Sequence, residues 1–184
     1  MGREIRKVPP NWDHPKSDEY PDRLKPMHDQ SYEGARSEWL EGLRAWDAGE
    51  DKHREKFKQD DGSYYDYWEW NGNPPNRKHY RPWKDEDATW FQLWETVSEG
   101  TPVSPPFATQ QELADHLAMN GDAWDQSRCT DPHTCRLFGL TPGKPGWGTK
   151  KAESFVFGSG WAPSLVMDNG RLMDGVTAVT QMAD

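Results

Sequence analysis

Residues 64–83 read YYDYWEWNGNPPNRKHYRPW, and seven of these twenty positions are Tyr or Trp while three are Pro. The whole chain holds 11 Trp and 6 Tyr, but Ile, Leu, Val and Phe together supply only 24 of its 184 residues. Such a shortage of aliphatic residues, with a net charge of -9, is typical of disordered chains. Because each buried ring removes roughly 150–250 Å² from water, rings can replace the missing aliphatic side chains. The sequence therefore predicts a folded protein with a tryptophan-rich core.

The same stretch contains a turn, Asn-Gly-Asn-Pro-Pro at 71–75, after an alternating segment at 65–70 that suits a short strand. We expect most of its rings to pack on the prolines and on helices, since a flat ring needs no regular secondary structure beside it. Recognition of a protein is one alternative, and binding of nucleic acid or glycan is another. The side chains predicted to contact a partner are Tyr64, Trp68, Trp70, Tyr80, Arg81 and Trp83.

Three helices are predicted around this stretch, at 31–49, 85–98 and 109–119. The first two regions carry apolar residues every three or four positions, which is the period of one helix face. The third begins with a capping box formed by Thr109 and Glu112. Either apolar stripe would also suit the contact face of a homo-oligomer.

A small antiparallel sheet is predicted mainly from the end of the chain. Residues 154–176 read as short strands, and Asn169-Gly170 between two apolar runs is typical of a hairpin turn. Val176, Val179 and Met182 fit the beginning of a last helical turn. Together with the helices, these segments predict an α+β fold.

Five prolines between positions 9 and 26 predict an extended arm over residues 1–30. Residues 31–184 are predicted to form one globular domain, with an irregular excursion rich in Gly, Pro and Asp at 122–153. No apolar run approaches the roughly 20 residues that span a bilayer, so we expect no membrane partner. The N-terminus lacks the apolar core of a signal peptide, and there are only two Cys, which favours a cytoplasmic protein.

Cys129, His133 and Cys135 are the best metal candidates, because zinc binds thiolate and imidazole ligands. Their spacing differs from the usual C-x2-C pair, however, and no second cluster supplies a fourth ligand. We therefore expect two ordinary thiols, with a disulfide or a zinc site as the alternatives. The loop at 143–150, GKPGWGTK, has the Lys and Thr of a phosphate-binding loop in reversed order, so we expect no nucleotide and no other cofactor.

The excess negative charge lies in the middle of the chain, where residues 61–128 carry 12 acidic and 5 basic side chains. A surface of this kind repels nucleic acid on average and suits a basic protein partner. No His lies beside a nucleophile in the sequence, so we assign no catalytic residues and expect a protein other than an enzyme. A catalytic site assembled from residues distant in the sequence is the alternative.

Three stretches form a distinctive set: GREIRKVPPNWDHP (2–15), WETVSEGTPVSPPFATQQELADHL (94–117) and GSGWAPSLVMDNGRLMDGV (158–176). Together they resemble a family of small, uncharacterised proteins encoded by bacteriophages and prophages. The resemblance covers most of the chain and is weakest across 122–153. It implies an accessory phage product in the cytoplasm of an infected bacterium.

With the acidic, aromatic composition, this context leads to a hypothesis of protein binding. The chain would inhibit a host or defence component, as anti-CRISPR proteins do, through an acidic aromatic surface. A structural or assembly protein of the phage particle is the first alternative. An enzyme with a scattered site is the second.

Overall fold

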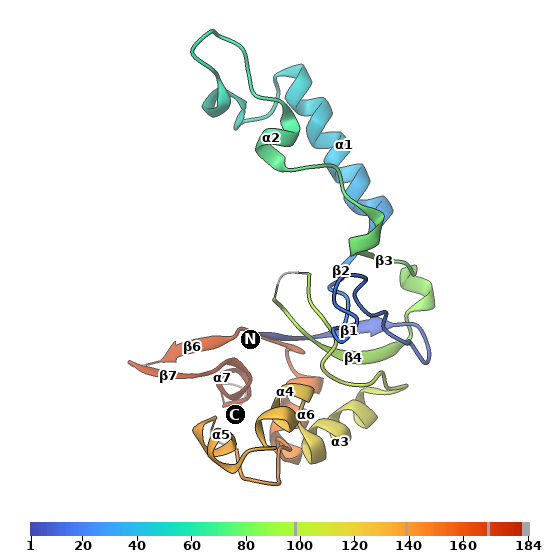
Figure 1. Ribbon diagram of the computed structural model, residues 1–184, viewed down its shortest axis with the longest axis vertical. Coiled ribbons are helices and arrows are strands. Elements are labelled where there is room, and N and C mark those ends of the chain that lie inside the picture. The colour runs from blue at the N-terminus through green and yellow to red at the C-terminus, as the bar shows by residue number, and fades with distance from the viewer. Residues whose placement is uncertain (98, 139, 169, 182–184) are drawn as a thin grey trace. The chain divides into compact units, whose positions relative to one another are not determined.

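The computed structural model describes residues 1–97, 99–138, 140–168 and 170–181. The chain divides into two compact units: unit one combines Met1–Met27 with Trp83–Asp184, and unit two is His28–Pro82 (Figure 1). Helices and an antiparallel sheet give the predicted α+β class. The predicted boundary at residue 30 does not match this division, because most of the supposed arm belongs to unit one.

Unit one is built on a three-stranded antiparallel sheet with the order β4-β1-β5. Its strands are β1 (Arg3–Val8), β4 (Trp90–Glu95) and β5 (Trp161–Ala162). Residues 101–107 are extended along β4 and bridge it at two points, between Trp94 and Pro102 and between Phe91 and Phe107. The beginning of the chain is therefore extended, but it is the central strand of a sheet rather than an arm.

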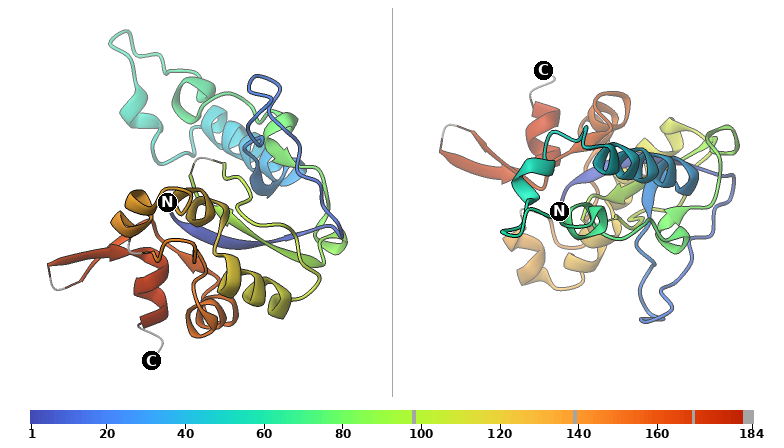
Figure 2. Two further views of the ribbon diagram at one scale, coloured as in Figure 1. Left: turned by 60° about the horizontal axis from the view of Figure 1, so that its bottom comes forward. Right: turned by 90° about the horizontal axis from the view of Figure 1, so that it is seen from above.

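One face of this sheet is packed with aliphatic side chains. Ile5 and Leu93 are paired across β1 and β4, so they share this face. Helices α3 (Gln110–Asn120) and α6 (Thr149–Phe157) pack together and contribute to it (Figure 2). The aliphatic cluster consists of Leu93, Val103, Leu113, Ala114, Leu117, Ala152, Phe155, Val156, Ala162 and Val176.

The opposite face is packed with indole rings and is covered by irregular segments. The tryptophan cluster consists of Val8, Met27, Trp83, Ala88 and Trp94, with Trp12 and Trp90 partly buried beside it. Arg6 holds the cluster together, because its Nη1 donates to the Met27 carbonyl at 2.7 Å and its guanidinium lies 4.4 Å from the centre of the Trp94 ring. Within unit one, the tryptophan-rich core that the sequence predicts is found on this face of the sheet and not on the aliphatic face.

Strand β4 lies where a helix was predicted at 85–98, and only a short 3₁₀ turn, η3 (Asp85–Asp87), precedes it. This prediction was wrong because the strand is buried on both faces of the sheet. Apolar residues then form a nearly continuous run, which matches a helical period as well as a strand. Ser98, the last residue of the predicted helix, lies outside the described residues.

The predicted irregular excursion at 122–153 contains regular structure. Helices α4 (Ala123–Arg128) and α5 (Pro132–Leu137) lie in it, and α6 begins in it. Asp122 and Asp131 are the N-caps of α4 and α5 and accept hydrogen bonds from backbone amides. The high Gly and Pro content of this segment favours irregular structure, whereas these two cap residues indicate helices. By contrast, the helix predicted at 109–119 is confirmed as α3, with its capping box present.

The C-terminal hairpin is confirmed, although it is not the main sheet. Strands β6 (Leu165–Asp168) and β7 (Arg171–Asp174) pair with each other as a separate two-stranded sheet. Residues 154–157, predicted as a strand, belong to α6. The predicted last helical turn is α7 (Gly175–Gln181). Asn169 and Met182, which entered these predictions, lie outside the described residues.

Unit two is organised along α1 (Tyr32–Ala48), which confirms the helix predicted at 31–49 with Ser31 as its N-cap. The remaining elements are β2 (His28–Ser31), η1 (Arg54–Phe57), α2 (Tyr67–Asn71), η2 (Arg77–His79) and β3 (Tyr80–Arg81), with β2 and β3 parallel. Helix α2 replaces the strand predicted at 65–70, because Asp66 and Glu69 form a capping box. Throughout the described part of the chain, no helix has both the length and the apolar character that crossing a membrane requires.

Candidate protein-binding surface

Helix α2 is held against α1 by rings and by two indole hydrogen bonds. The ring of Tyr67 is buried, with its centre 5.4 Å from that of Trp39 and 5.9 Å from that of Trp46. Trp46 Nε1 donates to the Tyr65 carbonyl at 3.0 Å, and Trp39 Nε1 donates to the Gly72 carbonyl at 3.1 Å. Both ends of α2 are therefore fixed by tryptophans of α1.

Gly42 of α1 makes the close approach of Tyr67 possible. A Cβ at this position would overlap the Tyr67 hydroxyl, so a larger residue would push the ring away. Burial raises the pKa of Tyr67, and the nearby Asp51 raises it further. The phenol therefore stays protonated near neutral pH and acts as a neutral packing group.

Three further rings of this region point into solvent. Tyr65, Trp68 and Trp70 are exposed by 44%, 51% and 36%, and we call these three rings the aromatic surface. Tyr65 and Trp68 line the same cavity, whereas Trp70 is two positions further along α2 and packs on Phe57. Trp68 Nε1 donates to Asp66 at 3.2 Å, while the Trp70 ring centre lies 4.4 Å from that of Phe57. Trp68 and Trp70 are thus held in defined positions, so these two side chains would lose little conformational freedom when a partner binds.

The aromatic surface lies in an acidic part of the sequence. Residues 60–76 contain four carboxylates, namely Asp60, Asp61, Asp66 and Glu69, and neither Lys nor Arg. The pKa of Asp61 lies below its ordinary value because the hydroxyl and amide of Ser63 donate to its carboxylate. The charge of Asp61 therefore persists well below neutral pH.

A cavity of about 370 Å³ lies beside the aromatic surface, between α1 and α2. Its lining includes the carboxylates of Asp47 and Asp66 and the exposed ring of Trp68. Arg54 also lines it, but its guanidinium lies over the Tyr64 ring, 3.9 Å from the ring centre. Carboxylates beside an exposed indole suit the cationic end of a Lys or Arg side chain.

The six predicted contact residues do not form one site. Trp68 and Trp70 belong to the aromatic surface, while Tyr64 is half-buried and donates its hydroxyl to Glu55 at 2.6 Å. Tyr80 and Arg81 lie in β3, where the Tyr80 ring packs near His28 and Tyr32 at the beginning of α1. Helix α2 packs on Trp39 and Trp46 of α1, which lie 7 and 14 residues from Tyr32, or about 10 and 21 Å at 1.5 Å per residue.

Trp83 is a correction to the predicted contact set. Only 7% of it is exposed, because it packs in the tryptophan cluster of unit one. Conversely, the prediction omitted Tyr65 and the supporting ring of Phe57. The capping box of Asp66 and Glu69 was the available signal for α2, but Tyr65 precedes this helix and no local signal indicates its exposure.

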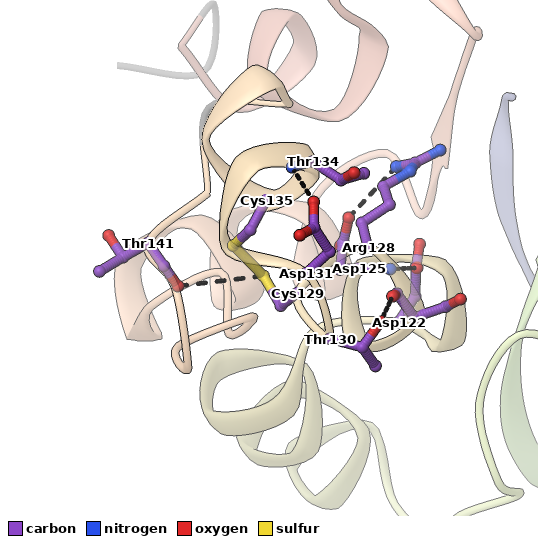
Figure 3. Close-up of a disulfide and its surroundings, with 10 residues drawn as sticks. Asp122, Asp125, Arg128, Cys129, Thr130, Asp131, Thr134, Cys135 and Thr141 are labelled. Carbon is purple, nitrogen blue, oxygen red and sulfur yellow. Dashed lines mark hydrogen bonds and ion pairs between the residues drawn. A yellow bond between two sulfur atoms is a disulfide. The ribbon is translucent and has the colours of Figure 1, made fainter.

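The two cysteines form a disulfide instead of the two thiols that we expected (Figure 3). Cys129 follows α4 and Cys135 lies in α5, and the turn between these helices brings their Cα atoms to 4.4 Å. The pairing also excludes the zinc alternative in this state, because neither sulfur is a free thiolate. His133 is exposed on α5. Among the described residues, His, Cys, Asp and Glu side chains form no group of three or more suited to a metal ion.

In comparisons with known proteins, the chain matches no protein-family model, no curated protein and no solved structure.

Proposed function

We propose that the protein acts by binding another protein through the aromatic surface of unit two. The observation that carries this proposal is the exposure of Trp68 and Trp70 on the anchored helix α2 and of Tyr65 just before it. Trp and Tyr are the residues most enriched in interface hot spots, because they bury a large area with few rotatable bonds.

The favoured partner presents a basic segment. Four carboxylates and no Lys or Arg in residues 60–76 would attract such a segment and repel an acidic one. The cavity beside Trp68 would receive one Lys or Arg side chain of the partner between Asp47 and Asp66. The same charge distribution disfavours nucleic acid, whose backbone is itself acidic.

The biological setting of the proposal comes from the phage resemblance. An accessory phage protein with this surface would bind a host or defence component in the infected bacterium and occlude its basic site. Inhibition of that component is then a matter of steric coverage, which requires no catalytic residue in this chain.

The test is affinity capture from infected bacteria with three forms of the full chain: the wild type, Trp68→Ala/Trp70→Ala, and Trp161→Ala. Trp161 is a matched control, because it is also exposed, by 50%, but belongs to unit one. The wild type and the control should capture one stoichiometric partner, with an affinity that falls as salt is raised. The double variant should bind roughly tenfold or more weakly. Equal capture by all three forms would contradict the proposal.

A second candidate is an assembly protein of the phage particle that contacts neighbouring copies of itself. It is favoured by the β6–β7 hairpin, where Leu165, Met167 and Leu172 are exposed by 57%, 73% and 58%. Exposed strand edges with apolar side chains are typical sites of strand addition. This candidate requires a fixed copy number in purified particles, and absence from the particles would exclude it.

A further inference from the structure

Unit one contains a charged cavity that the proposed protein-binding surface does not use. It has a volume of about 470 Å³ and lies between the start of β1, α4, α6 and the start of α7. Three cations and three carboxylates line it, namely Arg3, Arg128, Lys151, Asp122, Asp125 and Asp174. Its size is in the range of cavities that hold small molecules.

Arg3 supplies a buried cation whose hydrogen-bond donors are not all used by the described part of the protein. Its Nε bonds Asp122 at 2.6 Å, and the two side chains are exposed by only 5% and 2%. Arg3 Nη1 donates to the carbonyls of Met1 and Gly2. The hydrogen bonds of Arg3 to described residues use Nε and Nη1, and Nη2 is not one of the fully enclosed polar atoms that lack a partner. Nη2 can therefore donate to an acceptor on a ligand in the cavity.

Asp125 supplies a buried carboxylate whose contact with a cation is long. Trp147 Nε1 donates to its Oδ2 at 2.7 Å. Arg128 Nη1 forms an ion pair with its Oδ1 at 3.4 Å (Figure 3). Burial raises the pKa of Asp125, and the neighbouring charge of Asp122 raises it further. Arg3 pairs with Asp122 at 2.6 Å, whereas the ion pair of Asp125 with Arg128 is longer, at 3.4 Å. A cationic group on a ligand would stabilise the ionised form of Asp125.

The α6–α7 side of the cavity carries a second cation at a partly exposed position. Lys151 Nζ donates to Thr177 Oγ1 at 2.8 Å and lies 3.7 Å from Asp174 Oδ2. Asp174 accepts hydrogen bonds from the amides of Val176 and Thr177, which satisfy much of its charge. Lys151 therefore has donors left for an anionic group of a ligand.

We propose that this cavity binds a small zwitterion that carries a carboxylate and an ammonium group, such as a free α-amino acid. The ammonium group contacts Asp125, and the carboxylate contacts Arg3 Nη2 and Arg128. A simple anion would have to face three carboxylates, and a simple cation would have to face three basic side chains. Phe138, Leu140 and Val176 line the same cavity and would contact the apolar part of the ligand.

The test uses the full chain and the twenty standard L-amino acids as probes, each at millimolar concentration, with binding measured by thermal shift and calorimetry. Each amino acid that binds is then compared with its analogue lacking the ammonium group and its analogue lacking the carboxylate. Both analogues should bind roughly tenfold or more weakly, because each loses a charge-assisted contact.

Asp125→Asn is the diagnostic variant, since Asn still accepts from Trp147 but carries no charge. It should fold with unchanged or slightly higher stability and bind the amino acid at least about tenfold more weakly. Asp115→Asn is the matched control, because Asp115 is an exposed residue of α3 outside the cavity, and it should bind as the wild type does.

Three results would overturn the proposal: no amino acid binds, the analogue without the ammonium group binds as tightly, or the analogue without the carboxylate does. Equal binding by Asp125→Asn would also overturn it. None of these results depends on Trp68 or Trp70, so failure here leaves the protein-binding proposal standing.

Discussion

The two faces of the sheet in unit one are closed in different ways. On one face, regular helices meet aliphatic side chains, and Leu93, Leu113 and Leu117 are fully buried there. On the other face, irregular segments meet indole rings, with Trp94 fully buried under residues 9–27 and 83–88. In this leucine-poor chain, tryptophan packs where loops cover the sheet, because a flat ring can lie against irregular backbone and an indole N–H can bond its polar groups.

The largest effect is expected from truncating neighbours on opposite faces of β4. Leu93→Ala should lower the free energy of unfolding by about 2–5 kcal/mol, and Trp94→Ala by about 3–5 kcal/mol. Trp94 should be the more costly of the two, because its removal also leaves Gln92 and Arg6 without their contacts to the indole.

Hydrogen exchange would locate each effect. Leu93→Ala should expose amides of α3 and α6, whereas Trp94→Ala should expose amides of residues 9–27. If both variants loosened the same segments, the two faces would not be separate packing regions.

A smaller effect, about 2 kcal/mol, is expected from removing the disulfide in Cys129→Ala/Cys135→Ala. Helix α5 buries only Cys135, while Leu137 and Phe138 are exposed, and the Phe138 ring packs on the Arg128 guanidinium rather than in either cluster of the core. Reduction should therefore increase hydrogen exchange in α5 and leave both faces of the sheet protected. An equal loss of protection in β4 would show that α5 is part of the common core.

In unit two, rings also pack near irregular backbone. Gly42→Ala should destabilise the contact between α1 and α2 by about 1–2 kcal/mol, because the added methyl overlaps the Tyr67 hydroxyl. In an exposed helix the same change usually stabilises by about 1 kcal/mol, so the sign is diagnostic. Near-ultraviolet circular dichroism of the Tyr and Trp signals is the measurement, with Tyr67→Phe as a background that should relieve part of the clash.

The smallest effect is a pH dependence on the tryptophan face. Trp12 Nε1 donates to His14 Nδ1 at 3.2 Å, so Nε2 carries the proton and donates to the Lys25 carbonyl at 2.7 Å. Burial lowers the pKa of His14 below its ordinary value near 6.5, and Arg6 lowers it further, against the opposing effects of the Lys25 carbonyl and Asp13.

Since the unfolded chain then binds a proton more readily than the folded one, His14 should reduce stability as pH falls below 6.5. His14→Gln keeps both hydrogen bonds and should flatten this part of the stability curve measured by urea unfolding. His116→Gln tests the corresponding effect on the aliphatic side, because burial also lowers the pKa of His116. An unchanged curve in His14→Gln would contradict the assignment.

Local signals predicted local structure well. The caps at Ser31 and Thr109 identified α1 and α3, and Asn169-Gly170 identified the hairpin. Prediction from the sequence failed where pairing between distant segments determines the structure. Nothing in residues 90–95 indicates that they form a strand that is covered on both faces. The same limit applies to the charged cavity, whose lining comes from positions 1 to 177 and has no sequence motif.

Prediction of the contact residues failed for a related reason. Trp68 and Trp83 look alike in the sequence, but Trp68 is exposed beside its own helix cap and Trp83 is buried against distant residues. Burial of a ring depends on which segments return to cover it, and composition does not report this.

The order of the units along the chain has a consequence for synthesis on the ribosome. Strand β1 leaves the ribosome first, but its partners begin at residues 90 and 161, after all of unit two. Unit two is continuous and can fold as soon as residue 82 has emerged. Both edges of β1 remain unpaired until its partner strands have emerged. Its charges at Arg3, Glu4, Arg6 and Lys7 then keep a nascent strand from pairing with other chains.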